Sequence, residues 1–221
     1  MRVAGLDRKR SFLFDLDGTL LDSNEAHARA FREALSDGHP ELARAFDYEA
    51  VRGLDTPASL RRIGVSDPEA IARLADRKRA IYRELLRGGQ VQLHAGAAEL
   101  IAALHAAGAT LVLVTSASRR TAEEAIAATG IAHRFRGVVT SEDAGAPKST
   151  PEPFLAALTR FTLDAATCLT VDDAPAAALG SLRAGVDAAL VHGTEAPSGV
   201  PCFASLHALG AALGAWEAGA P

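Results

Sequence analysis

The chain has 221 residues, of which 48% are hydrophobic, 23% are charged and only 5% are aromatic. This composition allows a buried core with a smaller insert, argues against disorder, and favours helix-rich packing over an all-β sandwich. The net charge of −4 offers no basic footprint for nucleic acid, and two cysteines are too few for a disulfide framework or a structural zinc site. The sequence has no stretch of roughly 20 apolar residues and no apolar signal core near its start. We therefore expect a cytoplasmic protein that binds neither nucleic acid nor membrane, as a monomer or a weak homo-oligomer.

The first predicted element is a short buried strand over residues 12–14, a continuous apolar run that ends at Asp15. The next apolar strand begins only at residue 111, and this interval is too long for one crossover connection. Helical periodicity fills most of the interval, with helices predicted over residues 27–35, 41–51, 57–63 and 68–86. We interpret residues 23–90 as an inserted all-α helical cap domain, hinged near residues 22–23 and 88–89. Residues 1–22 and 91–221 then form the core domain.

From residue 97 onward, predicted helices and strands alternate. The helices cover residues 97–107, 119–128, 153–161 and 175–184, and the strands cover residues 111–114, 137–140, 168–171 and 188–191. Continuous apolar strands that alternate with helices predict an α/β fold with a doubly wound, Rossmann-like parallel sheet. The tail over residues 195–221 is rich in Ala, Gly and Pro, and we expect its end to be partly loose.

Polar residues follow the predicted strands directly: Asp15, Thr115 and Ser116, residues 141–143, and Asp172 and Asp173. In doubly wound sheets, ligands bind beyond the carboxyl ends of the strands, so these side chains are candidates for one site. Asp15 and Asp17 lie two residues apart after an apolar strand, which lets both carboxylates project into that site. A simple Asp-Gly turn would not require the second aspartate.

The segment Asp15-Leu16-Asp17-Gly18-Thr19 resembles the first motif, Asp-x-Asp-Gly-Thr, of the haloacid dehalogenase-like phosphatases. Three more motifs of this family follow in order, so that the resemblance covers about residues 12–192. The second motif lies in residues 114–118. The resemblance implies that the hydroxyl of Ser116, or alternatively of Thr115, binds phosphate together with the backbone N–H of Ala117.

The third motif is Lys148 before a proline-rich helix start, with Ser149 where the family usually has proline. The fourth is Asp172-Asp173, in which Asp173 matches the main metal ligand and Asp172 its acidic neighbour. Position 177 is alanine, whereas some family members have a further aspartate there. The resemblance thus implies a metal site with a reduced acidic cluster.

The resemblance implies a specific chemistry for these residues. Asp15 is the expected nucleophile, Asp17 the general acid and base, and Lys148 the cation that holds Asp15 and the phosphoryl group. The expected ligands of Mg²⁺ are Asp15, Asp17 through its backbone carbonyl, Asp173 and Asp172. We expect hydrolysis of a small phosphorylated metabolite, a sugar or polyol phosphate, with phosphoglycolate or a biosynthetic intermediate as the alternative. Asp17 argues against the halide-displacing branch of the superfamily, which needs neither a metal nor this residue.

The helical insert resembles the caps of the β-phosphoglucomutase-like subgroup, and its candidate substrate contacts are His27, Arg52 and Lys78. Each of them could instead be a packing or surface residue. A phosphosugar mutase is the alternative enzyme, although Thr56 occupies the position where the mutase cap has an arginine. A catalytically silent binding module is a further alternative, against which the four intact motif residues argue.

Overall fold

The computed structural model describes residues 8–193 and 195–215, and a six-stranded sheet in the order β5-β4-β1-β6-β7-β8 lies at its centre. The strands are β1 (Ser11–Phe14), β4 (Thr110–Val114), β5 (Gly137–Val139), β6 (Cys168–Asp172), β7 (Asp187–Val191) and β8 (Cys202–Phe203). Neighbouring strands of this sheet pair in parallel, with Phe12 opposite both Leu111 and Leu169. The predicted parallel sheet is therefore confirmed.

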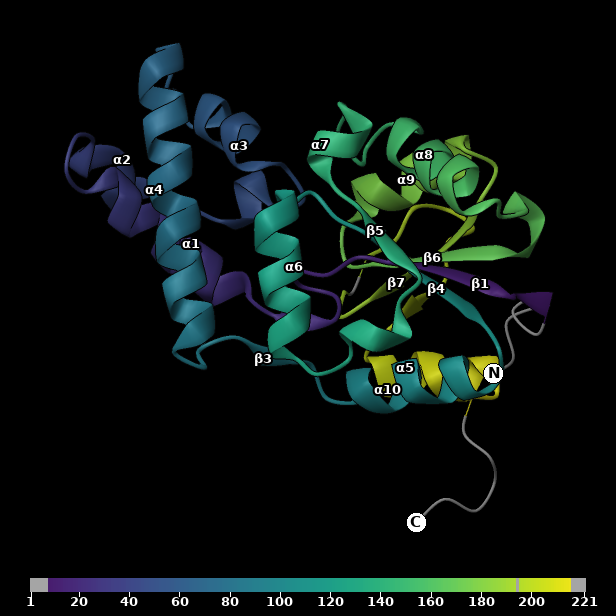
Figure 1. Ribbon diagram of the computed structural model, residues 1–221. Helices are drawn as coiled ribbons and strands as arrows, with labels where there is room; N and C mark the ends of the chain where they lie inside the picture. The colour runs from purple at the N-terminus through teal and green to yellow at the C-terminus, as the bar shows by residue number, and fades with distance from the viewer. Residues whose placement is uncertain (1–7, 194, 216–221) are drawn as a thin grey trace.

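Helices cover both faces of this sheet (Figure 1). On one face lie α5 (Ala97–Ala106) and α10 (Leu206–Leu213), and on the other lie α7 (Ser141–Ala144), α8 (Glu152–Phe161) and α9 (Pro175–Arg183). Successive β1 side chains enter different cores, because Phe12 and Phe14 belong to the cluster around α5 and α10, whereas Leu13 belongs to the cluster around α8. Burial on both faces explains why the central strands are continuous apolar runs. The short helices η3 (Ala132–Arg134) and η4 (Ala165–Thr167) lie in connections.

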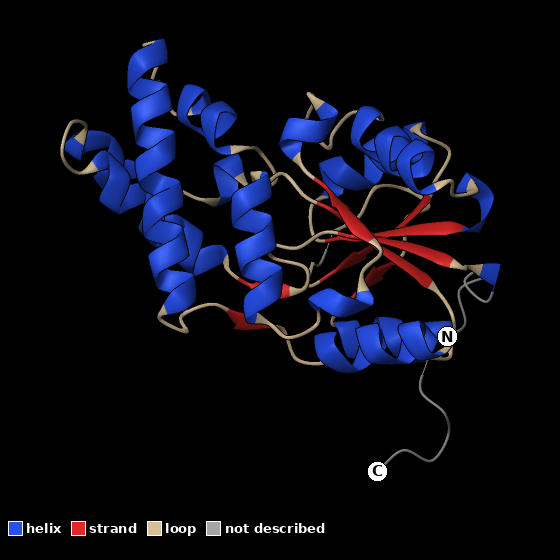
Figure 2. Ribbon diagram, viewed as in Figure 1, coloured by secondary structure: helices blue, strands red, loops and turns tan. Residues whose placement is uncertain are grey.

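A second group of helices packs beside the sheet and contains almost no strand (Figure 2). It comprises α1 (Asn24–Leu35), α2 (Pro40–Ala45), η2 (Glu49–Val51), α3 (Thr56–Arg62) and α4 (Pro68–Arg87). These helices share a core of their own that includes Phe31, Leu60 and Ile71. The side chains of Asp55 and Asp67 cap α3 and α4 by accepting backbone N–H bonds at 2.7 and 2.9 Å. This group is a helical cap, and α6 (Arg119–Ala128) of the core packs against α4.

The single helix predicted over residues 41–51 is wrong, because the chain leaves the helical conformation at Phe46 (ψ 117°). The ring of Phe46 packs on Phe31 with centroids 4.8 Å apart, which draws this residue into the cap core. The side chain of Asp47 then accepts the backbone N–H of Glu49 at 3.0 Å in a turn just before the short helix η2. Tertiary packing and this turn therefore divide the segment.

The two connections between the sheet and the helical cap pair with each other. β2 (Leu21–Asp22) and β3 (Gln92–Leu93) form an antiparallel pair in which Asp22 lies opposite Gln92. This pair lies within a few residues of the hinges predicted at residues 22–23 and 88–89. The tail contributes β8 and α10, which the sequence reasoning did not predict. Residues 216–221, at the end of the tail that we expected to be loose, lie outside the described residues.

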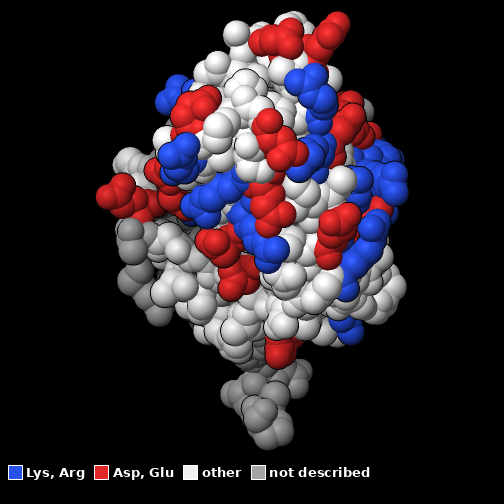
Figure 3. Space-filling view, turned by 90° about the vertical axis from the view of Figure 1, so that its left-hand side faces the viewer, with Lys and Arg blue, Asp and Glu red and all other residues white. Residues whose placement is uncertain are grey.

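The outer face of the helical cap carries interspersed charges of both signs (Figure 3). Arg29 pairs with Glu33 at 2.6 Å, and Arg77 pairs with Asp37 at 2.7 Å. Exposed pairs of this kind contribute little to stability and keep the face solvated. Across residues 8–193 and 195–215, every helix is too short or too polar to span a membrane.

Candidate active site

The carboxyl ends of β1, β4 and β6 meet at the edge of the sheet that faces the helical cap (Figure 1). A cavity of about 60 Å³ lies at this edge. Asp15 and Lys148 line it from the core, and His27 and Lys78 line it from the cap. The cavity therefore joins side chains that are far apart in the sequence at the place where such sheets bind ligands.

Lys148 holds two buried carboxylates at the end of the sheet. Its Nζ donates to Asp15 Oδ1 at 2.5 Å and to Asp172 Oδ2 at 2.7 Å, and all three side chains are buried. Burial raises the pKa of Asp15; Lys148 opposes this effect, while the charges of Asp172 and Asp173 add to it. Burial would lower the pKa of Lys148, but its two carboxylate partners raise it above its usual value. The site therefore contains a permanent cation beside a carboxylate that its surroundings destabilise.

Asp173 has one satisfied and one unsatisfied carboxylate oxygen. The hydroxyl of Thr19 lies 3.1 Å from Asp173 Oδ1 and 3.3 Å from Asp15 Oδ2, so that it bridges the two carboxylates. Asp173 Oδ2 is buried and has no hydrogen-bond partner among the described residues. Arg52 from the cap forms a longer ion pair with this oxygen at 3.5 Å. A buried carboxylate oxygen that accepts no hydrogen bond is costly, and a cation bound to it would offset this cost.

The acidic cluster has the composition of a Mg²⁺ site. Carboxylate oxygens of Asp15, Asp172 and Asp173 lie within 4.8 Å of one another, and all three residues are buried. Burial and the charge of Asp172 raise the pKa of Asp173 to about 6. A side chain at Gly18 would place its Cβ 2.6 Å from Asp173 Oδ2, so glycine leaves the space beside this oxygen free. Hard oxygen donors and an unsatisfied carboxylate fit Mg²⁺.

The carboxylate of Asp17 contacts the cap and not this acidic cluster. Its Oδ1 accepts a hydrogen bond from Tyr82 Oη at 2.7 Å and lies 3.0 Å from His27 Nε2. Lys78 Nζ lies 2.7 Å from His27 Nδ1, and because an ammonium only donates, Nδ1 accepts and Nε2 carries the proton toward Asp17. The ring of His27 also stacks on Tyr82 with centroids 4.0 Å apart. The cap therefore fixes the orientation of Asp17.

These contacts shift the pKa values of the groups around Asp17. Burial alone would raise the pKa of Asp17, but its contacts with His27, Tyr82 and Lys78 hold it well below the usual value. Burial lowers the pKa of Lys78 to about 8, and burial together with Lys78 lowers the pKa of His27. Asp17 is therefore ionised at neutral pH and acts as a hydrogen-bond acceptor.

The segment after β4 supplies the hydroxyl groups of the site. Thr115 Oγ1 accepts the backbone N–H of Ala117 at 3.1 Å, and Ser116 Oγ donates to the carbonyl of Gly53 in the cap at 2.9 Å. Thr115, Ser116 and Ala117 all line the cavity. The predicted phosphate donors, the Ser116 hydroxyl and the Ala117 N–H, therefore bond to groups of the protein itself. A phosphate ligand would take the place of the Gly53 carbonyl as the acceptor for Ser116, and of the Thr115 hydroxyl as the acceptor for Ala117.

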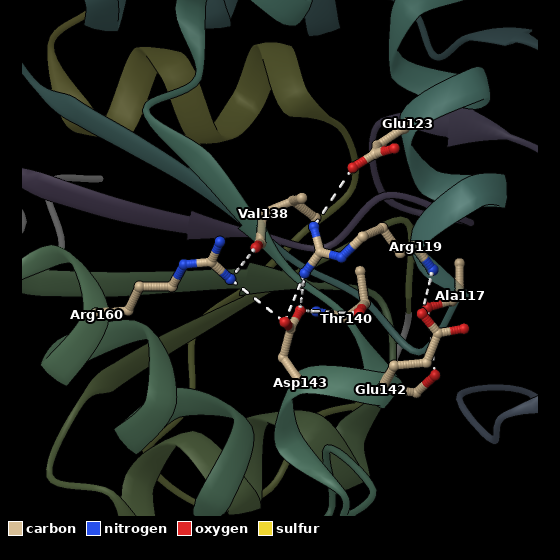
Figure 4. Close-up of polar contacts among 9 residues, drawn as sticks. Ala117, Arg119, Glu123, Val138, Thr140, Glu142, Asp143 and Arg160 are labelled. Atoms are coloured by element: carbon tan, nitrogen blue, oxygen red, sulfur yellow. Dashed lines mark hydrogen bonds and ion pairs between the residues drawn. The ribbon is translucent and has the colours of Figure 1, made fainter.

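Figure 4 shows the polar contacts of α7 with Arg119 at the start of α6 and with Arg160 of α8. Glu142 accepts the backbone N–H of Arg119 at 3.1 Å, and Asp143 pairs with the guanidinium of Arg119. Arg160 of α8 approaches Asp143 at 3.3 Å from the other side. Residues 141–143, the polar residues predicted after the strand over residues 137–140, therefore tie α6, α7 and α8 together, and they are not in the lining of the cavity beside Asp15.

The cavity brings most of the predicted site residues together: Asp15, Asp17, Asp172, Asp173, Lys148, Thr115, Ser116, Ala117, His27 and Lys78. Arg52 is not in its lining and reaches the site through Asp173. The sequence reasoning did not select Tyr82 or Thr19. Tyr82 lies one helical turn after Lys78 on the buried face of α4, and Thr19 ends the first motif, so both could have been found.

Comparison with known proteins finds relatives over most of the chain. A sequence model of the family described as haloacid dehalogenase-like hydrolase matches residues 12–191. The protein CbbY of Rhodobacter capsulatus is 30% identical over 190 residues, which cover 80% of this chain and 82% of CbbY. Hexitol phosphatase A of Escherichia coli strain K12 is 32% identical over 206 residues, which cover 88% of this chain and 87% of the phosphatase.

Solved structures show the same fold. A CbbY mutant from Rhodobacter sphaeroides in complex with xylulose-(1,5)bisphosphate matches with a TM-score of 0.80 and 22% identity. The match covers 93% of this chain and 99% of that one. The Rossmann-like core and the helical cap are therefore shared with this structure.

Proposed function

Because this chain belongs to the haloacid dehalogenase-like hydrolase family, we propose that it is a Mg²⁺-dependent phosphatase that forms an aspartyl-phosphate on Asp15. One observation supports this proposal above all: the buried Asp15 carboxylate lines the cavity between Lys148 and an acidic cluster that fits a divalent cation. The relatives named as phosphatases support a phosphoric monoester hydrolase as the enzyme class.

Asp15, Asp172 and Asp173 are the side chains that would hold Mg²⁺, with the backbone carbonyl of Asp17 as the further proposed ligand. The unsatisfied Asp173 Oδ2 is the donor with the clearest need for a partner. When bound, Mg²⁺ supplies positive charge that offsets the repulsion between the phosphate dianion and the Asp15 carboxylate. Asp172 is already held by Lys148 and by the backbone N–H of Ala174 at 2.9 Å.

Asp15 is the proposed nucleophile. A bond forms between its carboxylate oxygen and phosphorus while the bond from phosphorus to the leaving oxygen breaks, which yields an aspartyl-phosphate and an alkoxide. Lys148, already 2.5 Å from Asp15, is placed to neutralise the negative charge on the transferring group. Water then attacks phosphorus, the bond to Asp15 breaks, and inorganic phosphate leaves with the carboxylate restored.

Asp17 is the proposed general acid and base. Its low pKa in the free protein keeps it ionised, which a base requires, but it also makes Asp17 a weak base until its pKa rises in the complex. To protonate the leaving alkoxide it must first gain a proton, and a phosphate dianion bound beside it raises its pKa through like-charge repulsion. His27 and Tyr82 aim the carboxylate, and Lys78 holds His27 in the tautomer that donates to Asp17.

We infer that the substrate is a small sugar or polyol phosphate. The name of hexitol phosphatase A and the xylulose-(1,5)bisphosphate in the CbbY structure both support this class. The lining of the cavity includes Thr56, Ser118 and Thr121, whose hydroxyl groups can bond to a polyhydroxylated molecule. Residues 23–90 are the proposed lid over this site, with Arg52 as a further contact to an anionic substrate. The cytoplasmic location and the oligomeric state stay predictions.

The test is a phosphate-release assay over sugar, polyol and glycolate phosphates, with Mg²⁺ or with EDTA. We expect release that depends on Mg²⁺ and falls by about 10³-fold or more in Asp15→Asn, as expected for loss of a nucleophile. Asp22→Asn makes the same chemical change at an exposed aspartate close in sequence, and it should retain activity. Hydroxylamine should trap the acyl-phosphate in the wild type and not in Asp15→Asn.

Three results would contradict the proposal. The first is the absence of phosphate release from every substrate, and the second is equal release by the wild type and Asp15→Asn. The third is conversion of a hexose 1-phosphate into its 6-phosphate without net phosphate release, which would replace hydrolysis by phosphosugar transfer.

A further inference from the structure

His192, directly after β7, has a backbone conformation that side chains rarely adopt. Among the described residues other than glycine, only His192 (φ 61°) and Thr162 (φ 51°) have a positive φ. Thr162 is the C-cap of α8, where a left-handed residue is the ordinary way to end a helix. His192 follows a strand and has no such explanation. A strained conformation of this kind persists only where the surroundings fix it, and such residues cluster at functional sites.

The strained backbone directs the His192 ring toward the turn that follows Asp15. His192 Nε2 lies 3.1 Å from the carbonyl oxygen of Thr19. Because a carbonyl oxygen only accepts, Nε2 carries the proton and donates. The backbone N–H of His192 donates to the Phe203 carbonyl at 3.0 Å, which anchors the residue to the edge strand β8. The ring is therefore held from its backbone and bonded at its tip.

A second histidine completes the support. The ring of His94 stacks on the ring of His192 with centroids 4.0 Å apart and an interplanar angle of 24°. The backbone N–H of His94 donates to the Leu20 carbonyl at 2.8 Å, and its ring hydrogen-bonds to the backbone of Gly18. The two histidines therefore contact the backbone of three consecutive residues, Gly18, Thr19 and Leu20.

The supported turn carries groups of the acidic cluster. The Thr19 hydroxyl bridges Asp15 at 3.3 Å and Asp173 at 3.1 Å. The Cα of Gly18 lies so close to Asp173 that an added Cβ would be 2.6 Å from Oδ2. A shift of this turn would therefore move the Thr19 bridge and close or open the space at Asp173.

We propose that His192, seated by the stacked ring of His94, is a positioning residue that fixes the turn 18–20 and, through the Thr19 hydroxyl, the relative placement of Asp15 and Asp173. The proposal rests on the phosphatase activity proposed above. His192 lies outside the four family motifs quoted from the sequence and touches neither the cavity lining nor the acidic cluster. Its effect on turnover is indirect, because a reaction limited by geometry is sensitive to displacements of its nucleophile.

The test compares two substitutions of His192: one removes the backbone strain together with the hydrogen bond, and the other keeps both. His192→Gly relieves the backbone strain but removes the donor to Thr19. His192→Gln keeps an N–H donor at a similar reach but remains strained at positive φ. If the bond to Thr19 positions the turn, the strained Gln variant is the more active of the two. If the ring only fills space, the relaxed Gly variant equals or exceeds it.

Kinetics with p-nitrophenyl phosphate and Mg²⁺ give the first readout. We expect kcat of His192→Gly to fall by about fivefold or more, the equivalent of one typical hydrogen bond, with KM changed by less than about twofold. His192→Gln should recover at least about half of the lost kcat. Thr162→Gly, which relieves the same kind of strain at a helix end, should leave kcat unchanged.

Hydrogen exchange of the peptide covering residues 16–21 gives a readout without turnover. In the turn, the N–H of Gly18 donates to the carbonyl of Leu21 at 2.8 Å, and the N–H of Leu20 donates to the carbonyl of Leu16 at 3.0 Å. Their exchange should be about fivefold faster in His192→Gly and close to the wild type in His192→Gln and Thr162→Gly. Equal exchange and equal kcat in His192→Gly and the wild type would overturn the proposal, as would a Gln variant below the Gly variant. If the wild type releases no phosphate, the proposed function fails, and the exchange experiment still decides the positioning role.

Discussion

Replacing Asp15 with asparagine should abolish turnover and yet make the metal-free protein more stable. The side chain of Asp15 is buried between Lys148 and two other carboxylates, and its pKa is raised. A raised pKa means that the folded protein resists the ionised form of this group. Asparagine keeps the shape of aspartate, can accept from Lys148, can donate to a neighbouring carboxylate and carries no charge.

The distances set the size of the effect. With an effective dielectric constant of about 20, the attraction between Asp15 and Lys148 at 2.5 Å is about 7 kcal/mol. Repulsion from Asp172 and from Asp173, each within 4.8 Å, is at least about 3 kcal/mol per pair. These interactions nearly cancel, which leaves the cost of burying the charge. We therefore expect the free energy of unfolding to rise by about 1–3 kcal/mol, which for a chain of this size is a Tm increase of about 2–4 °C per kcal/mol.

The direction of the Asp15 pKa shift determines how the stability difference between the two proteins depends on pH. Because the folded-state pKa of Asp15 lies above its unfolded value, the wild type loses stability as the pH rises from about 4 through the folded-state pKa. The advantage of Asp15→Asn should thus be small near pH 4 and largest at neutral pH. Mg²⁺ should reduce or reverse the stability advantage of Asp15→Asn, because a ligand that binds only the folded state stabilises the tighter binder more, and the wild type retains the proposed ligand Asp15.

Thermal unfolding in EDTA and in Mg²⁺, followed by circular dichroism at several pH values, measures these differences. Asp22→Asn serves as the matched control, and its Tm should follow the wild type. A lower Tm of Asp15→Asn in EDTA at neutral pH would refute the reasoning, because it would show that the Lys148 contact outweighs both burial and repulsion.

Three further predictions concern the same site. Asp17→Asn should lose about 1–3 kcal/mol of stability at pH 7, because the folded protein favours the ionised form of Asp17 and depresses its pKa. Urea unfolding should show that this loss becomes smaller only when the pH falls below about 4. Lys148→Met leaves the buried carboxylates without their cation and should be destabilised by about 3–5 kcal/mol, with part of the loss recovered when Mg²⁺ is added to a thermal scan. Gly18→Ala forces a Cβ to within 2.6 Å of Asp173 Oδ2 at a φ of +84°, so calorimetry should show weaker Mg²⁺ binding than in the wild type, and an unchanged affinity would contradict the assigned role of this glycine.

Much of the core could be predicted because its strands are buried on both faces. The apolar runs over residues 12–14 and 111–114 differ from β1 and β4 by one residue at one end. The helix predicted over residues 119–128 coincides with α6. Strand β8 could not be predicted, because two residues carry no periodicity and its place depends on pairing with β7. The break at Phe46 depends on the Phe31 ring, which no local signal reveals.

The candidate site divides in the same way. Asp15 and Lys148 are 133 residues apart. Asp15 follows a strand whose end lies at the ligand-binding edge of the sheet, whereas Lys148 lies in the loop after α7 and is predicted only by its resemblance to the third motif. The direction of the Asp17 side chain could not be predicted, because His27 and Tyr82 reach it from cap helices whose packing is a tertiary property. The role of His192 was equally hidden, since its backbone conformation is visible only in the structure. The roles assigned to these residues stay predictions until the variants are measured.

The small pair of β2 and β3 has a consequence for how this enzyme can be re-engineered. Asp22 and Gln92, the positions at which the chain leaves and re-enters the core, are direct partners across an antiparallel pair, with Cα atoms about 5 Å apart. The helical segment is therefore connected to the core like a loop whose two ends are adjacent. The entropic cost of closing such a loop rises only slowly with its length. Any helical unit whose ends lie about 5 Å apart could be grafted at this point without stretching β1 or displacing Asp15. Such a graft would keep Asp15, Asp172 and Asp173 in place, but it would have to supply its own groups where His27 and Tyr82 now contact Asp17.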